Sequence, residues 1–278
     1  MKIVKIFIIS LTFLVVFGHK LVLAQGELSA YDIITQSRLS FFYAGDDMKA
    51  KVLMELINKN GQKRIRELTM LRKDYAEGGN PSFAEAAEGR QKYFMYFHQP
   101  ADVKDTTFMV YKYPDKDDDR WLFIPAINLV KRIAANDKYS SFVGSDFTYE
   151  DVSGRKPDED THTLLRKDIL DGKDCYVIES IPKSASEYTK RISWIDATDF
   201  LPLKEEFYDK QNEVYRQFEA QEIRSMNGIL TITKRVMKNT KTGHTSEATF
   251  EEVEYNLGIG DDIFSERYLR KAPVQWIK

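Results

Sequence analysis

Apolar and polar residues alternate with a period of two along much of the chain, which is typical of half-buried strands rather than helices. The first clear case runs from Lys49 to Leu56. Residues 58–61, Asn-Lys-Asn-Gly, supply a turn, so residues 64–72 are expected to return as the hairpin partner. Further strands are predicted at residues 93–97, 107–113, 121–124, 129–133, 147–152, 162–170, 175–181, 189–195, 203–208, 214–223, 230–237 and 246–255.

Short, turn-like connections separate most of these strands. Gaps such as residues 171–173 and 226–228 leave no room for the crossover helices that parallel strands require. We therefore predict a mainly β (α+β) fold, in which one curled antiparallel sheet forms an incomplete β-barrel. A helix is predicted at residues 29–42 with Ser29 as its N-cap, and a short helix at residues 258–269. Residues 75–89 are expected to form a loop.

Residues 1–24 have the pattern of a secretory signal peptide. Lys2 and Lys5 provide the positive start, residues 6–17 are mostly apolar, and Ala24 ends a stretch suited to a signal peptidase. The apolar stretch is shorter than the roughly 20 residues of a membrane-spanning helix. We expect cleavage before Gln25, a single domain over residues 25–278 and a periplasmic location; retention of the segment as an anchor is the alternative. No cysteine follows the stretch, which argues against a lipid anchor there.

Composition narrows the classes of function. The chain has 278 residues, of which 42% are hydrophobic and 30% charged, as is ordinary for a globular protein. Because 41 basic residues face 43 acidic ones, the chain lacks the basic excess of a nucleic-acid-binding protein. Its one cysteine, Cys175, falls in a predicted strand, where we expect a small buried residue.

Familiar catalytic and metal-binding motifs are missing from the sequence. The histidines have no metal-ligand spacing, and there is neither a nucleophile elbow nor a phosphate-binding loop. Residues 115–119 begin like a calcium-binding loop, but Arg120 stands where that loop needs glycine and Ala126 where it needs glutamate. We therefore expect no enzyme activity, no cofactor and no bound metal.

Residues 119–152 contain a W-x-x-x-P-A segment, a basic pair before isoleucine, and the motif S-F-x-G-S-D-F-S/T-Y-E-D. These features comprise Trp121, Pro125, Ala126, Lys131, Arg132, Ile133, Ser141, Phe142, Gly144, Ser145, Asp146, Phe147, Thr148, Tyr149, Glu150 and Asp151. In these residues the chain resembles the LolA-like family of outer-membrane lipoprotein-sorting proteins. The resemblance implies an incomplete antiparallel barrel closed by helices, a fold shared with periplasmic lipoprotein carriers. The Gly144-Ser145-Asp146 segment is either a turn whose Asp and Ser side chains bond neighbouring backbone amides, which we favour, or a surface that meets a membrane partner.

A curled sheet of this kind has a concave face that lipid chains can occupy. Each CH₂ group removed from water contributes about 0.8 kcal/mol, and methionine adapts its shape to varied ligands. The candidate lipid-binding residues are Val52, Met54, Leu56, Met70, Met95, Phe97, Met109, Tyr111, Trp121 and Phe123.

Two hypotheses follow from this face. In the first, the protein is a soluble periplasmic carrier of lipid or lipoprotein acyl chains, in outer-membrane lipoprotein sorting or lipid transport, with an inner-membrane transporter as a further partner. In the second, the same residues fill a packed core, and the protein is an accessory or sensor subunit that docks onto a membrane transporter.

Overall fold

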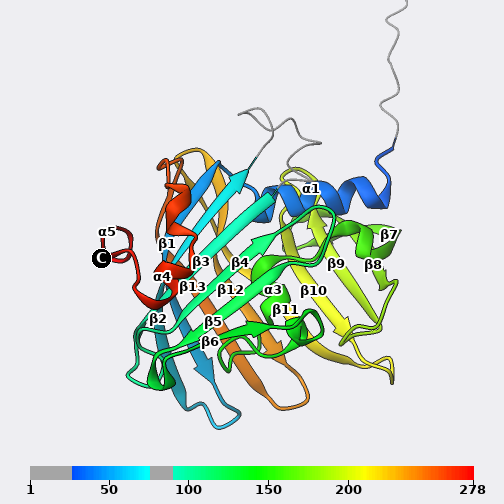
Figure 1. Cartoon of the computed structure of the whole chain (residues 1–278). Helices are drawn as coiled ribbons and strands as arrows, with labels where there is room; N and C mark the ends of the chain where they lie inside the picture. The colour runs from blue at the N-terminus through cyan, green and yellow to red at the C-terminus, as the bar shows by residue number, and fades with distance from the viewer. Residues whose placement is uncertain (1–26, 76–89) are drawn as a thin grey trace, which may run out of the picture.

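The computed structural model describes residues 27–75 and 90–278 (Figure 1). The predicted signal peptide and nearly all of the predicted 75–89 loop lie outside the described residues. The strands are β1 (Asp47–Ile57), β2 (Lys63–Tyr75), β3 (Arg90–Gln99), β4 (Thr107–Lys112), β5 (Asp119–Ile124), β6 (Leu129–Ile133), β7 (Asp160–Leu170), β8 (Lys173–Pro182), β9 (Lys190–Asp196), β10 (Pro202–Tyr208), β11 (Val214–Met226), β12 (Ile229–Asn239) and β13 (His244–Tyr255).

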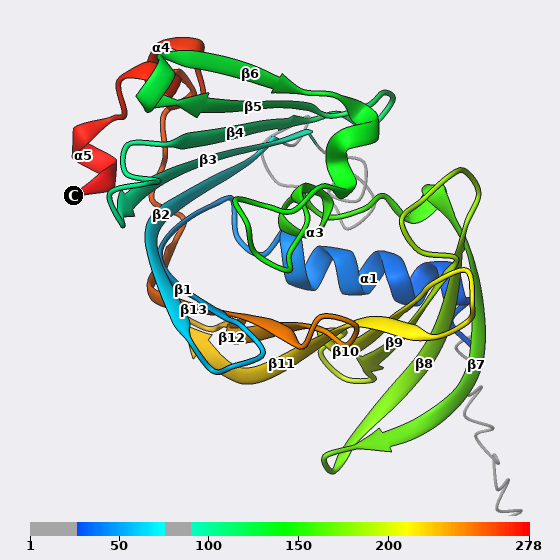
Figure 2. The same ribbon diagram turned by 90° about the horizontal axis from the view of Figure 1, so that it is seen from below.

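All these strands belong to one 13-stranded sheet with the order β6-β5-β4-β3-β2-β1-β13-β12-β11-β10-β9-β8-β7. Every neighbouring pair is antiparallel. The first and last strands therefore meet in the middle of the sheet, and strands from the centre of the chain form its two edges. Figure 2 shows the sheet curved around a concave side, without β6 meeting β7. This confirms the predicted incomplete barrel of the LolA-like type.

Helix α1 (Ala30–Phe42) lies on the concave side of the sheet (Figure 2). Its start is fixed by a capping box: the amide of Asp32 donates to Ser29 Oγ at 3.1 Å, and the amide of Ser29 donates to Asp32 Oδ2 at 3.2 Å. Ile33 and Ile34 pack against Ile178 of β8 and Ile195 of β9. The predicted helix and its N-cap are confirmed.

The C-terminal segment covers the convex face of the first strands. After β13 it forms η4 (Asp261–Ile263), α4 (Glu266–Arg270) and α5 (Val274–Ile277). Ile259, Phe264 and Leu269 pack with residues of β2 to β5. The single helix predicted at residues 258–269 is thus two short turns, because the backbone of Phe264 leaves the helical region at φ −88°, ψ 66°.

One predicted strand is a helix instead. Residues 147–152 alternate in polarity, but the chain forms α3 (Tyr149–Ser153) there. The amide of Thr148 donates to Asp151 Oδ2 at 2.7 Å, and the amide of Asp151 donates to Thr148 Oγ1 at 3.1 Å. This reciprocal cap satisfies two backbone N–H groups that a strand would have to pair with a neighbouring strand. The capping therefore stabilises a helix here, although the polarity of the residues alternates as in a strand. Short 3₁₀ helices η1 (Pro125–Ile127), η2 (Ala135–Tyr139) and η3 (Pro157–Glu159) complete the segment between β5 and β7.

Candidate functional site

A cavity of about 130 Å³ lies between the concave face of the sheet, α1 and the segment that carries α3. Both halves of the chain supply its apolar wall. The apolar lining residues include Phe41, Phe42, Val52, Met54, Leu68, Met70, Met95, Phe142, Phe147, Phe207, Phe218, Met237, Ala248 and Phe250. The wall therefore combines flexible methionine side chains with flat aromatic rings, which suits contact with an apolar chain.

Four of the predicted lipid-binding residues line this cavity: Val52, Met54, Met70 and Met95. Their pairing explains why they share a face. Val52 lies opposite Leu68 in the β1–β2 ladder, and Met70 lies opposite Met95 in the β2–β3 ladder. Directly opposed residues of an antiparallel pair point to the same side of the sheet.

Leu56 and Phe97 are buried in the same inner cluster, but neither lines the cavity.

The other four predicted residues lie on the opposite face. Met109, Tyr111, Trp121 and Phe123 pack against the C-terminal segment on the convex side, away from the cavity. The hydroxyl of Tyr111 donates to the carbonyl of Phe264 in that segment.

The register of β4 explains this correction. Met95 of β3 pairs with Phe108, and Phe94 pairs with Met109. Phe108 and Val110 therefore face inward, whereas Met109 faces outward. All residues from Thr107 to Val110 are buried, so polarity along this strand does not distinguish its two faces.

The family-signature residues before the loop have separate positions. Trp121 stands edge-on to Tyr111, with ring centroids 5.0 Å apart, on the convex face. Pro125 begins η1, and Arg132 forms an ion pair with Asp119 on the sheet surface. These residues shape the β5–β6 edge rather than the cavity.

The rest of the signature folds into a tight loop beside the cavity. Gly144 has φ +79°, a left-handed conformation that favours glycine. Ser145 Oγ donates to the carbonyl of Phe142 at 2.7 Å. Asp146 Oδ2 accepts from Ser246 Oγ at 2.7 Å and contacts His244 Nδ1 at 2.5 Å. These bonds hold the loop against β13, but they differ from the expected ones: Ser145 donates to a backbone carbonyl, and Asp146 bonds side chains rather than backbone amides.

The aromatic residues of this loop form part of the cavity wall. Phe142 and Phe147 line it. Tyr149 is buried beside Phe142, with ring centroids 5.6 Å apart. The signature thus places an aromatic wedge on the concave side of the sheet.

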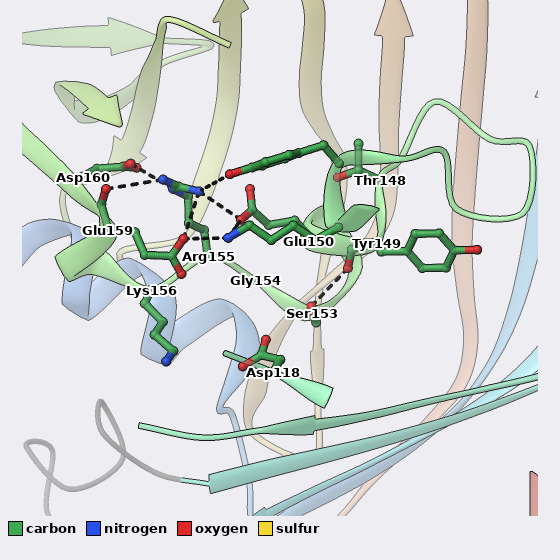
Figure 3. Close-up of polar contacts among 12 residues, drawn as sticks. Asp118, Thr148, Tyr149, Glu150, Ser153, Gly154, Arg155, Lys156, Glu159 and Asp160 are labelled. Carbon is green, nitrogen blue, oxygen red and sulfur yellow. Dashed lines mark hydrogen bonds and ion pairs between the residues drawn. The ribbon is translucent and has the colours of Figure 1, made fainter. Parts of the chain in front are cut away.

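A buried network of charges supports the same segment (Figure 3). The guanidinium of Arg155 lies 3.0 Å from Glu150, 3.0 Å from Glu159 and 2.8 Å from Asp160. Lys138 adds a second cation at 2.8 Å from both glutamates. Each buried charge here has a partner of opposite sign, which offsets the cost of removing it from water.

Charged side chains also enter the cavity itself. Its lining includes Arg38, Arg155, Arg191 and Arg235 against Glu150, Asp151 and Glu205. Sequence reasoning missed all of them as site residues. For Arg235 the sequence did offer a clue. It shares the period-two positions of Thr233 and Met237 in β12, and a charged residue is unusual on an inward face.

Within the described residues, no group of three or more His, Cys, Asp or Glu side chains is placed to hold a metal ion. Burial raises the pKa of the Cys175 thiol, so less of the reactive thiolate is present at neutral pH. No helix in residues 27–75 or 90–278 combines the length and apolar character needed to cross a membrane.

Comparison with known proteins places this fold and cavity in a family. A family model described as an uncharacterized protein matches residues 89–271, more than half of the chain. The structure is similar to that of a DUF1329 family protein from Desulfovibrio piger, with a TM-score of 0.77 and 25% identity over 86% of this chain and 97% of the other. It is also similar to a domain from Vibrio parahaemolyticus named for outer-membrane lipoprotein sorting, with a TM-score of 0.76 and 26% identity over 87% and 98% of the two chains.

A LolA superfamily protein from Nitrosomonas europaea shares the fold, with a TM-score of 0.64 and 18% identity over 87% of this chain and 100% of the other. Among curated proteins, none is detectably similar. The open, curled antiparallel sheet of this chain therefore has a LolA-like fold. The chain belongs to the family whose model matches residues 89–271, and it is similar in structure to proteins named for the DUF1329 family and for outer-membrane lipoprotein sorting, as its signature indicated.

Proposed function

We propose that this protein is a periplasmic carrier that holds lipid or lipoprotein acyl chains in its concave cavity without covalent catalysis. The observation that carries the proposal is the cavity beside α1, whose apolar wall includes four methionine and eight aromatic residues. The similarity to a domain named for outer-membrane lipoprotein sorting supports the same role. The proposal includes export through the predicted signal peptide, folding of residues 25–278 as one domain, and delivery to or from an inner-membrane transporter.

The cavity volume limits the size of the ligand that this conformation can hold. About 130 Å³ is close to the volume of an engineered apolar cavity that accepts benzene. A long acyl chain therefore requires a wider opening. Phe41 and Phe42, at the end of α1, belong to the cavity wall, so a displacement of α1 would enlarge the space.

The proposal is tested by native mass spectrometry of the protein purified from cell envelopes. We expect bound lipid on the natural chain. Ala248 is suited to blocking the cavity, because it is buried, lines the wall and lies opposite Met54 in the β1–β13 ladder. The variant Ala248→Phe places a ring in that space and should carry no lipid.

Ala272→Phe is the matched control, because it makes the same change in the segment that packs on the convex face. It should keep the bound lipid. Circular dichroism checks that both variants fold. A natural chain without bound lipid, or an Ala248→Phe variant that retains it, contradicts the carrier function and favours an accessory subunit with a packed interior.

A further inference from the structure

Arg235 occupies the inward face of β12 at the wall of the cavity. It lies opposite Ala248 of β13 and Ala220 of β11, so its neighbours across both ladders are methyl groups. It lines the main cavity and also an adjoining one of about 30 Å³. Its guanidinium is thus placed where two internal spaces meet.

Two aromatic rings hold this guanidinium. Its central carbon lies 4.6 Å from the ring centroid of Phe41 on α1 and 4.0 Å from that of Phe250 on β13. Aromatic faces attract a cation but accept no conventional hydrogen bonds. Within the described residues, the side chain of Arg235 forms no hydrogen bond and no ion pair, and its buried Nε has no hydrogen-bond partner.

The other cavity arginines differ in this respect. Arg155 pairs with Glu150 at 3.0 Å, and Arg191 pairs with Glu205 at 3.3 Å. Arg38 donates to the hydroxyl of Tyr43 at 2.7 Å.

The remaining cavity carboxylate, Asp151, is paired with Arg216 at 2.7 Å. Each acidic group of the wall is therefore engaged by another cation.

Arg235 remains charged under ordinary conditions. Burial lowers its pKa to about 10, while Tyr255 and Tyr93 act in the opposite direction. Arg72, which lines the adjoining cavity, is by contrast paired with Asp74 at 3.3 Å. A buried cation without an anion is costly, and a guanidinium matches the geometry of a carboxylate or phosphate.

From this geometry we infer that the cavity recognises an amphiphile with an anionic end, a carboxylate or a phosphate group, which pairs with Arg235 while its tail contacts the methionine wall. The inference rests on the proposed carrier function and narrows its cargo. The acyl chains of a lipoprotein anchor are joined by ester and amide bonds and bring no negative charge to this position. A free fatty acid or an alkyl phosphate supplies one.

The test compares the binding of decanoate, decyl phosphate, methyl decanoate and inorganic phosphate to the delipidated protein by isothermal titration calorimetry. We expect the two anionic amphiphiles to bind at least about tenfold more tightly than the methyl ester, as is usual for a charge-assisted pair. Inorganic phosphate alone should bind far more weakly. This preference of the natural chain tests the inference without any substitution.

Variants then locate the preference. Arg235→Leu should bind decanoate and its methyl ester equally, and its fold is checked by circular dichroism, because removing an unpaired buried charge is compatible with folding. Arg235→Lys should keep part of the preference. The matched control is Arg224→Leu, which removes an exposed arginine that pairs with Glu222 on β11 and should change nothing.

The outcomes separate the two proposals. Equal binding of decanoate and methyl decanoate by the natural chain, or a preference that survives in Arg235→Leu, overturns the inference and leaves the carrier function intact. Inorganic phosphate that binds as tightly as decyl phosphate also overturns it, since the tail then contributes nothing. If no compound with a tail binds, both the inference and the carrier function are wrong.

Discussion

Replacing Met95 by alanine tests whether the concave cavity binds a chain, and Met109 provides a matched comparison. The two methionines lie on adjacent strands, and each is 2% exposed. Met95 lines the cavity, whereas Met109 packs against the C-terminal segment on the other face. A buried Met→Ala change costs about 2–5 kcal/mol, so both variants should lose stability to a similar degree in urea unfolding.

Ligand binding should separate them. Met95→Ala enlarges the cavity by the side-chain atoms it removes, so the chain length of the fatty acid bound most tightly should increase by about three carbon atoms. Met109→Ala should leave the preferred chain length unchanged. Displacement of a fluorescent fatty acid by acids of six to sixteen carbons measures this preference. A shift in both variants, or in neither, would refute the assignment of the cavity as the binding site.

Three further predictions concern the supports of the cavity. Arg155→Met should cost about 3–5 kcal/mol in urea unfolding, because it removes the closest cation from the buried Asp160 and leaves Glu150 and Glu159 with Lys138 alone; a loss below about 1 kcal/mol would contradict this. Burial raises the pKa of Asp74 from 3.8 to about 6, although the nearby charge of Arg72 lowers it. Folding therefore favours the protonated carboxyl, and the free energy of unfolding falls as pH rises through this range. Asp74→Asn should therefore gain about 1–3 kcal/mol at pH 8 and nothing at pH 3; an equal gain at both values would exclude this origin. Ser246→Ala removes two hydrogen bonds to Asp146 and should lower the free energy of unfolding by about 1–3 kcal/mol. An unchanged urea unfolding curve would contradict this prediction.

Most of the sheet was predictable from sequence because its strands are joined by short turns. The β1–β2 hairpin and the consecutive strands β10 to β13 follow directly from alternation and turn residues. The exception, α3, carries its own signal in the Thr148–Asp151 cap. Such a cap is a local feature that a period-two pattern conceals.

The cavity was only partly predictable. Val52 and Met54 lie on a strand whose other face carries Lys49, Lys51 and Glu55, so their direction is largely encoded locally although Leu53 shares that face. Met109 lies on a strand buried on both sides, and its direction depends on pairing with Phe94 and on the C-terminal segment. The position of the Arg235 guanidinium between Phe41 and Phe250 depends on residues far apart in the chain. Such relations exist only after folding.

The pairing of β1 with β13 has a consequence for how the protein is made. Met48 pairs with Tyr255, so the central seam of the sheet joins residues from near the two ends of the chain. The first hairpins leave the ribosome or the export channel long before β13 is available, and β1 meanwhile offers an open hydrogen-bonding edge to any other strand. Contacts this distant in sequence slow folding. A nascent chain that stops short of β13 should therefore be the form most prone to aggregate.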